Sequence, residues 1–108
     1  MTAYLYDLSG RWIAFRASTE SKYLFDTTGE WIGWFPWGDA EAVTPDGEYL
    51  GTVVDDRLVS AFGHTSRGFP AYPGAPAYPG LPYDPGNAGY ASGFGGYEDV
   101  RMEHQLLA

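Results

Sequence analysis

The sequence predicts an all-β protein in which repeated β-hairpins are arranged round an axis and a long extended tail follows. Two observations lead to this prediction. Residues 4–14, 23–33 and 41–51 align without gaps on a glycine, and each carries strand-forming residues on both sides of a turn. After residue 63 the composition changes to a segment rich in proline, glycine and tyrosine, which favours extended chain over packed structure.

The turn of each repeat has the chemistry of a short β-hairpin. Asp or Thr opens each turn, where a short polar side chain accepts a hydrogen bond from the backbone two residues on. A glycine follows three residues later, at the position that needs a positive φ in a three-residue hairpin with a glycine bulge. The glycines lie 19 and 18 residues apart, which suits one hairpin with its return. We therefore assign a structural role to the turn glycines Gly10, Gly29 and Gly47.

The positions after each turn hold the same kinds of side chain in the same order. A large aromatic residue comes first, then a branched aliphatic residue, then a small one. A small residue at one strand position in every unit predicts a close approach of two backbones, so the strands are expected to crowd together there. The three columns are Trp12, Trp31 and Tyr49; Ile13, Ile32 and Leu50; and Ala14, Gly33 and Gly51.

A fourth repeat is present in degraded form. Residues 52–54 lead through the polar pair Asp55-Asp56 into a seventh strand at 57–63. Two arrangements supply its partner strand. Either the chain turns back at residues 63–65, or the hairpin closes after a long excursion through residues 97–102.

The tail repeats a Tyr-Pro-Gly theme over residues 69–86. Prolines this dense fix φ and remove backbone donors, so polyproline-like or disordered chain is expected. The chain accordingly divides into a hairpin domain at 1–63, a low-complexity segment at 64–96 and a C-terminal segment at 97–108.

The repeated Y-x-Y-D-x-x-G-x-x-I-G unit, the four-hairpin count and the Pro/Gly tail resemble the 4-fold beta-flower domains of bacteria. The resemblance covers about residues 3–63, and it implies a shallow, symmetric β-barrel whose hairpins splay as petals. That family is similar in shape to lipid-binding tubby-like domains and has no assigned activity, so no site residues carry over. A second resemblance, through the Y-D-x-x-G-R core at residues 6–11, is to tyrosine-aspartate repeats, which build large shells from long arrays.

Composition excludes several classes of function. Six Lys and Arg against 14 Asp and Glu give a net charge of -8, so the surface would repel nucleic-acid phosphates and anionic membranes. The absence of cysteine excludes disulfides and thiolate metal sites. The start lacks a basic and an apolar signal region, and no stretch reaches the roughly 18 apolar residues of a membrane span. We expect a cytoplasmic protein without a transmembrane segment.

Catalytic side chains are sparse. His64 and His104 are the only histidines, and both are expected to be solvated loop residues rather than metal ligands. The turn role of Asp7 and Asp26 accounts for these carboxylates. The glycines at 93–96 precede no helix that could bind a phosphate. We expect no enzyme, no metal and no cofactor.

The aromatic run at residues 31–38 is the most unusual segment. On a regular strand, Trp31 and Phe35 share one face and Trp34 lies on the other, and a small β unit is not expected to bury both. The rings then either form an exposed surface for a ligand or seal the barrel ends and an oligomer interface. The candidate binding residues are Trp12, Trp31, Trp34, Phe35, Trp37 and Tyr49.

The leading hypothesis is a non-catalytic binding or scaffold domain whose aromatic surface engages a lipid or other apolar small molecule. One alternative is structural self-assembly, with the aromatic cluster buried in a homo-oligomer interface. The other is recognition of a polyproline or carbohydrate partner, since Trp and Tyr grooves bind polyproline segments. The protein's own Tyr-Pro-Gly tail is such a segment and would lie across Trp34 and Trp37.

Overall fold

The computed structural model of the chain describes residues 2–65 and 67–100. This described part holds eight strands and no helix, so the all-β prediction is confirmed. Strands that are neighbours in sequence are neighbours in the sheet, and all of these pairs are antiparallel. The strands are β1 (Ala3–Tyr6), β2 (Trp12–Arg16), β3 (Tyr23–Asp26), β4 (Trp31–Trp34), β5 (Glu41–Val43), β6 (Tyr49–Val54), β7 (Arg57–Ala61) and β8 (Tyr97–Asp99).

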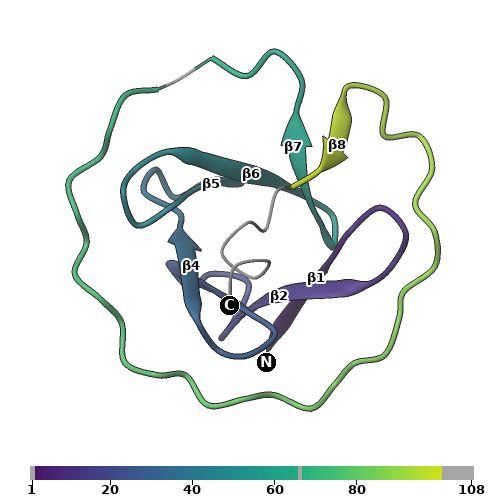
Figure 1. Cartoon of the computed structure of the whole chain (residues 1–108), viewed down its shortest axis with the longest axis horizontal. Coiled ribbons are helices and arrows are strands. Elements are labelled where there is room, and N and C mark those ends of the chain that lie inside the picture. The colour runs from purple at the N-terminus through teal and green to yellow at the C-terminus, as the bar shows by residue number, and fades with distance from the viewer. Residues whose placement is uncertain (1, 66, 101–108) are drawn as a thin grey trace.

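The first seven strands close into a mixed barrel (Figure 1). Closure comes from β7, which lies parallel to β1 at Tyr6 and Arg57, and the Tyr6 N–H donates to the Asp56 carbonyl at 2.8 Å. The buried Arg57 guanidinium donates to the Asp7 carbonyl at 3.0 Å and to the Asp56 carboxylate at 2.9 Å. The predicted all-β barrel of repeated hairpins is therefore present. Arg57 stabilises the point where β7 and β1 close it.

The three regular hairpins have turns of the predicted kind. The turn glycines have φ values of +95°, +84° and +93° in chain order. The Asp7 carboxylate accepts the backbone N–H groups of Ser9 and Arg11 at 3.0 and 2.9 Å. Asp26 repeats this pattern in the second hairpin, with Thr28 and Glu30 as donors. Local side-chain bonding therefore shapes these turns.

A β-bulge in each hairpin explains the order of the columns. In the first hairpin Tyr6 pairs with Trp12 and Leu5 pairs with Ala14, so Ile13 is the extra residue. The same shift occurs in the other two hairpins, where the extra residues are Ile32 and Leu50. A bulge re-aims a side chain that strict alternation would turn outward. Two consecutive residues of each second strand therefore pack inward.

The glycines in the column of small residues lie where neighbouring backbones approach closely, as predicted. A Cβ atom added to Gly33 would lie 2.6 Å from the Val43 carbonyl oxygen, and one added to Gly51 would lie 3.0 Å from that of Val59. Because these strands crowd together, a cluster of buried side chains occupies the interior. Its members are Leu5, Ile13, Ala14, Leu24, Ile32, Phe35, Ala42, Leu58 and Val100.

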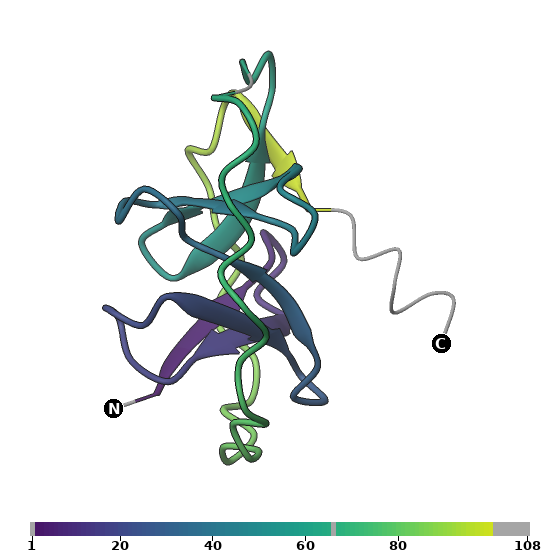
Figure 2. The same ribbon diagram turned by 90° about the vertical axis from the view of Figure 1, so that its left-hand side faces the viewer.

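The fourth hairpin closes through the long excursion. β7 ends at Ala61, two residues earlier than predicted, and pairs antiparallel with β8. The Phe62 N–H donates to the Gly96 carbonyl at 2.8 Å. Residues 62–65 and 67–96 therefore belong to one long connection from β7 to β8, here called the belt. Figure 1 shows the belt encircling the barrel, and Figure 2 shows it edge-on as a narrow band.

The belt has a period of three residues. Its six prolines stand at every third position from Pro70 to Pro85, and a polyproline II helix has three residues per turn. All but one of them are half-buried, whereas the belt tyrosines 72, 78, 83 and 90 are exposed. Gly74, Gly80 and Gly86 follow every second proline and have positive φ values of +86°, +73° and +73°, so the chain bends at these points rather than forming one straight polyproline II helix.

Candidate functional site

The first two hairpins carry the same pair of aromatic rings. Tyr4 packs edge-on against Trp12 with ring centroids 5.8 Å apart, and Tyr23 packs edge-on against Trp31 at 5.7 Å. Each tryptophan N–H donates to a carbonyl two residues on, at 2.8 Å in both hairpins. These bonds hold the indoles in one orientation, so the two hairpins present equivalent surfaces.

Both surfaces are occupied by the belt. The Tyr23 hydroxyl donates to the Gly74 carbonyl at 2.9 Å, and the Tyr4 hydroxyl donates to the Tyr83 carbonyl at 2.8 Å. The Trp31 ring also contacts the ring of Tyr72, with centroids 5.8 Å apart. A buried tyrosine ring with its hydroxyl on a partner carbonyl combines apolar contact with a directional bond.

The first turn is fastened to the belt through backbone groups. The Ala88 N–H donates to the Gly10 carbonyl at 2.7 Å, and the Ala91 N–H donates to the Leu8 carbonyl at 2.8 Å. The Leu8 N–H in turn donates to the Asp99 carboxylate at 2.9 Å. A Cβ atom on Gly10 would collide with the Ala88 carbonyl oxygen, so this glycine also makes room for the belt.

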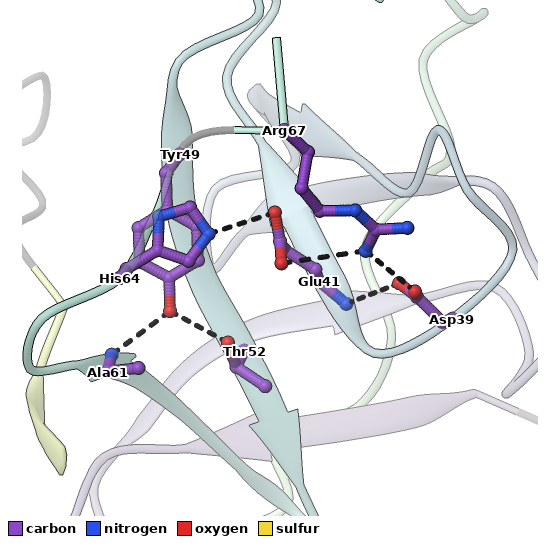
Figure 3. Close-up of polar contacts among 7 residues, drawn as sticks. All are labelled: Asp39, Glu41, Tyr49, Thr52, Ala61, His64 and Arg67. Atoms are coloured by element: carbon purple, nitrogen blue, oxygen red, sulfur yellow. Dashed lines mark hydrogen bonds and ion pairs between the residues drawn. The ribbon is translucent and has the colours of Figure 1, made fainter. Parts of the chain in front are cut away.

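The third hairpin replaces the Tyr–Trp pair by a polar cluster. In the repeat alignment Glu41 takes the place of the tyrosine and Tyr49 that of the tryptophan. The imidazole of His64 stacks on the Tyr49 ring at 3.6 Å and 7° (Figure 3). The Tyr49 hydroxyl is 2.7 Å from that of Thr52 and accepts the Ala61 N–H at 3.0 Å.

Ionic contacts in this cluster tie the beginning of the belt to the hairpin (Figure 3). His64 Nε2 lies 3.0 Å from the Glu41 carboxylate, and both atoms are buried from solvent, so each is the other's polar partner. Arg67 reaches the Asp39 carboxylate at 2.8 Å and Glu41 at 3.6 Å. Its guanidinium also lies over the ring of Trp37, 4.1 Å from the ring centroid, which is a cation–π contact.

The carboxyl group of Asp39 is perturbed by this arrangement. The hydrogen bond from Arg67, followed by that from the Glu41 backbone N–H, lowers the pKa of Asp39 below its usual value. The hydrogen bond to Asp39 correspondingly raises the pKa of Arg67. The pair therefore stays ionised throughout the neutral range, and it closes the cluster toward solvent. We call His64, Arg67, Asp39, Glu41 and Tyr49 the latch.

The interpretation of His64 as a solvated loop residue was wrong. Its side chain is 17% exposed and paired with Glu41. The sequence carried no sign of this pairing, because the two residues meet only when the belt leaves β7 beside β5. His104 lies outside the described residues. Within residues 2–65 and 67–100, no three acidic or histidine side chains converge on a point that would hold a metal ion.

The candidate aromatic residues do not form one exposed patch. None of the six is exposed: Trp34 and Phe35 are buried and the other four are half-buried. The expectation that a small β unit would not bury both faces of this run was wrong, because the bulge turns Ile32 inward and Phe35 joins the core. The six residues are Trp12, Trp31, Trp34, Phe35, Trp37 and Tyr49.

The belt contacts two of the barrel's tryptophans. It reaches Trp37 through Arg67 and Trp31 through Tyr72, while Trp34 is only 7% exposed. The exposed large apolar side chains are instead found after β7. They are Phe62, Phe69, Tyr72, Tyr78, Leu81, Tyr83 and Tyr90.

An apolar hollow of about 420 Å³ opens between the second hairpin and the belt. Its walls include Tyr23 and Phe25 from β3 and Pro76, Tyr78 and Pro79 from the belt. This volume is within the range of small-molecule sites. Among the described residues no helix has the length and apolarity needed to cross a membrane.

No family model, curated protein or solved structure matches this chain. The candidate sites therefore rest on the geometry of the belt, the latch and the hollow.

Proposed function

We propose that the protein is a non-catalytic binding module whose Tyr–Trp pairs recognise polyproline-type chain. Within the chain, the belt is the proline-rich segment that these pairs contact. Within the same proposal it is a beta-flower-like domain of the cytoplasm, and its role is binding or scaffolding rather than catalysis.

The hydroxyl contacts of the two equivalent tyrosines support this proposal. The carbonyls that accept from Tyr23 and Tyr4 belong to Gly74 and Tyr83, nine residues apart. Nine residues are three periods of the proline repeat, so the two hairpins meet equivalent positions of the belt. Gly74 and Gly80, with φ values of +86° and +73°, depart from polyproline II geometry and bend the chain round the barrel. Recognition of this kind uses aromatic grooves and a preformed extended ligand.

A peptide with the sequence of residues 69–86 tests the proposal. In the native chain the belt competes at the high effective concentration of a tethered ligand, so the receptor should be a variant whose residues 69–92 are replaced by Gly/Ser of equal length. We expect this variant to bind the labelled peptide in fluorescence anisotropy, and the native chain to bind it far more weakly.

Two controls make the measurement specific. A peptide of the same composition whose prolines no longer recur at every third position should bind weakly. Changing Tyr23→Phe in the receptor should weaken binding severalfold, because one hydrogen bond is lost. Equal binding of both peptides by a folded receptor would refute polyproline recognition.

Binding of a lipid-like or other apolar ligand is the second candidate, and the hollow beside Tyr23 and Phe25 favours it. Native mass spectrometry of the gently purified chain separates the possibilities. A monomer that carries extractable extra mass would support an apolar ligand. A homo-oligomer without added mass would support self-assembly through the exposed belt tyrosines instead.

A further inference from the structure

A second hollow, of about 630 Å³, lies away from the contacts between the belt and the Tyr–Trp pairs. It is bounded by the connection from β2 to β3 and by the connection from β4 to β5. Apolar groups form part of its wall, among them Phe35, Pro36 and Val53, and Arg16 and Lys22 also line it. Its volume suits a small organic ligand.

Arg16 is held in place beside this hollow without a negatively charged partner. Its Nε and Nη2 atoms both donate to the Ser21 carbonyl, at 2.9 and 2.6 Å. The guanidinium lies over the Phe35 ring, 4.0 Å from its centroid. No carboxylate of the described residues forms an ion pair with it. Burial of this unpaired cation lowers the pKa of Arg16.

Only one edge of the Arg16 guanidinium forms hydrogen bonds with the described chain. The Ser21 carbonyl occupies the edge formed by Nε and Nη2, and Nη1 makes no hydrogen bond within the described chain. A guanidinium presents five donors in a planar fork that matches a carboxylate. The end that carries Nη1 therefore remains available for a second, charged acceptor.

Lys22 adds a second unpaired cation to the same hollow. Its ammonium group lies 5.1 Å from the ring centroid of Tyr23 and 5.9 Å from that of Trp34, with no ion pair to a described carboxylate. By contrast, Arg57 and Arg67 do have acidic partners.

Two acidic residues also line the hollow and limit what it accepts. Asp39 is already engaged by Arg67 at 2.8 Å, whereas Glu20 is exposed at the rim. Together with the net charge, they disfavour a ligand with several negative charges. A single carboxylate suits the free guanidinium edge, and the apolar wall suits a hydrocarbon or aromatic body next to it.

We propose that this hollow binds a small monocarboxylate with an apolar body. The carboxylate bonds to the free edge of Arg16 within reach of Lys22, and the body packs on Phe35 and Val53. Lys22 also contacts Tyr23 of the proposed polyproline surface, but none of the described belt residues lines this hollow. Either proposal can fail without the other, because one is tested with hexanoate and the other with the belt peptide.

Titration of the full chain with hexanoate, hexanamide and acetate tests the proposal, with ¹⁵N NMR shifts as the readout. We expect hexanoate to shift the Arg16 Nε–H signal and to bind roughly tenfold more tightly than hexanamide, which lacks the charge that strengthens hydrogen bonds. Acetate should also bind more weakly, because it lacks the apolar body. Absence of saturable hexanoate binding, or equal affinity for hexanamide, would overturn the proposal.

Substitutions assign the site to these side chains. Arg16→Lys and Lys22→Gln should each weaken hexanoate binding severalfold. Arg11→Gln is the control for Lys22→Gln, because it removes the same charge from an exposed side chain on the first hairpin. An equal loss in Arg11→Gln would show a general charge effect and refute the site. Lys22 is exposed, so its variant remains informative if the Arg16 variant does not fold.

Discussion

The first two hairpins and the third hold the same belt by different chemistry. At the position where Tyr4 and Tyr23 donate a hydroxyl to a belt carbonyl, the third repeat has Glu41, which pairs with His64. Tyrosine bonds to carbonyls suit any polyproline chain that presents the correct side, and the prolines repeat every three residues. The latch instead depends on the side chains of His64 and Arg67, which do not recur along the belt. It therefore fixes the start of the belt on the third hairpin, whereas the tyrosines stabilise the later part of the belt.

Substitution of the turn glycines by alanine is expected to show the largest difference in stability between the hairpins. Gly10→Ala should destabilise the fold by about 3 kcal/mol, because a positive φ and a clash with the belt backbone add together. Gly47→Ala should cost only about 1 kcal/mol, because its Cβ would lie 3.1 Å from the movable ring of Phe69. Urea unfolding measures both values.

Gly93→Ala is the control for backbone strain alone, since its φ is +78° and a Cβ there meets no atom within 4 Å. If Gly10→Ala cost no more than Gly93→Ala, the belt would not be pressed against the first turn.

Removal of the buried carboxylate of the latch is expected to have the next largest effect. Glu41→Ala leaves His64 Nε2 buried without its partner, which should cost about 2 kcal/mol. Glu41→Gln keeps an acceptor and should retain most of the stability. Equal losses for the two variants in thermal unfolding would mean that the polar contact between residue 41 and His64 contributes little.

Loss of a single tyrosine hydroxyl should have a smaller effect. Tyr4→Phe and Tyr23→Phe should each reduce the free energy of unfolding by about 1 kcal/mol, because one hydrogen bond to a belt carbonyl is lost. Tyr90→Phe is the matched control, since that side chain is 80% exposed. Hydrogen exchange of the amides near residues 74 and 83 would show whether the loss is local to the belt.

The smallest expected effect concerns the pH dependence of the latch. Because the pKa of Asp39 is lowered in the folded state, its stabilising contribution is present above the unfolded pKa of about 4. This contribution disappears as the pH falls through the folded pKa. Both side chains of the pair are partly exposed, so screening by solvent keeps this contribution small. Melting temperatures of the native chain and Asp39→Asn should differ less at pH 3 than at pH 6; a constant difference would contradict this origin.

Much of the barrel was predictable because its hairpins are local structures. The turn glycines and the small column follow from residues within one repeat, since a positive φ or a missing side chain is needed wherever that turn or strand occurs. The inward direction of Ile32 was not predictable in this way. It depends on a bulge, and the alternation expected of a regular strand placed Ile32 opposite Phe35, although both lie in the core.

The belt was only half predictable. Extended chain was expected from the proline content, and the three-residue period is also present in the sequence from Pro70 to Pro85. The proline period shows which positions of the belt are equivalent, but it does not show which barrel residues those positions contact. The pairing of β8 with β7 joins residues more than thirty positions apart, and local chemistry does not determine such a contact.

The sequence by itself determined the all-β class, the repeated turns and the extended character of the tail, because each depends on backbone preferences of neighbouring residues. Only the tertiary structure decided which aromatic rings are covered and which are exposed. Burial depends on the path of the belt round the barrel, and that path is set by contacts between distant residues such as His64 with Glu41 and Tyr4 with Tyr83. For this reason the barrel tryptophans are covered, while the tyrosines of the belt face solvent.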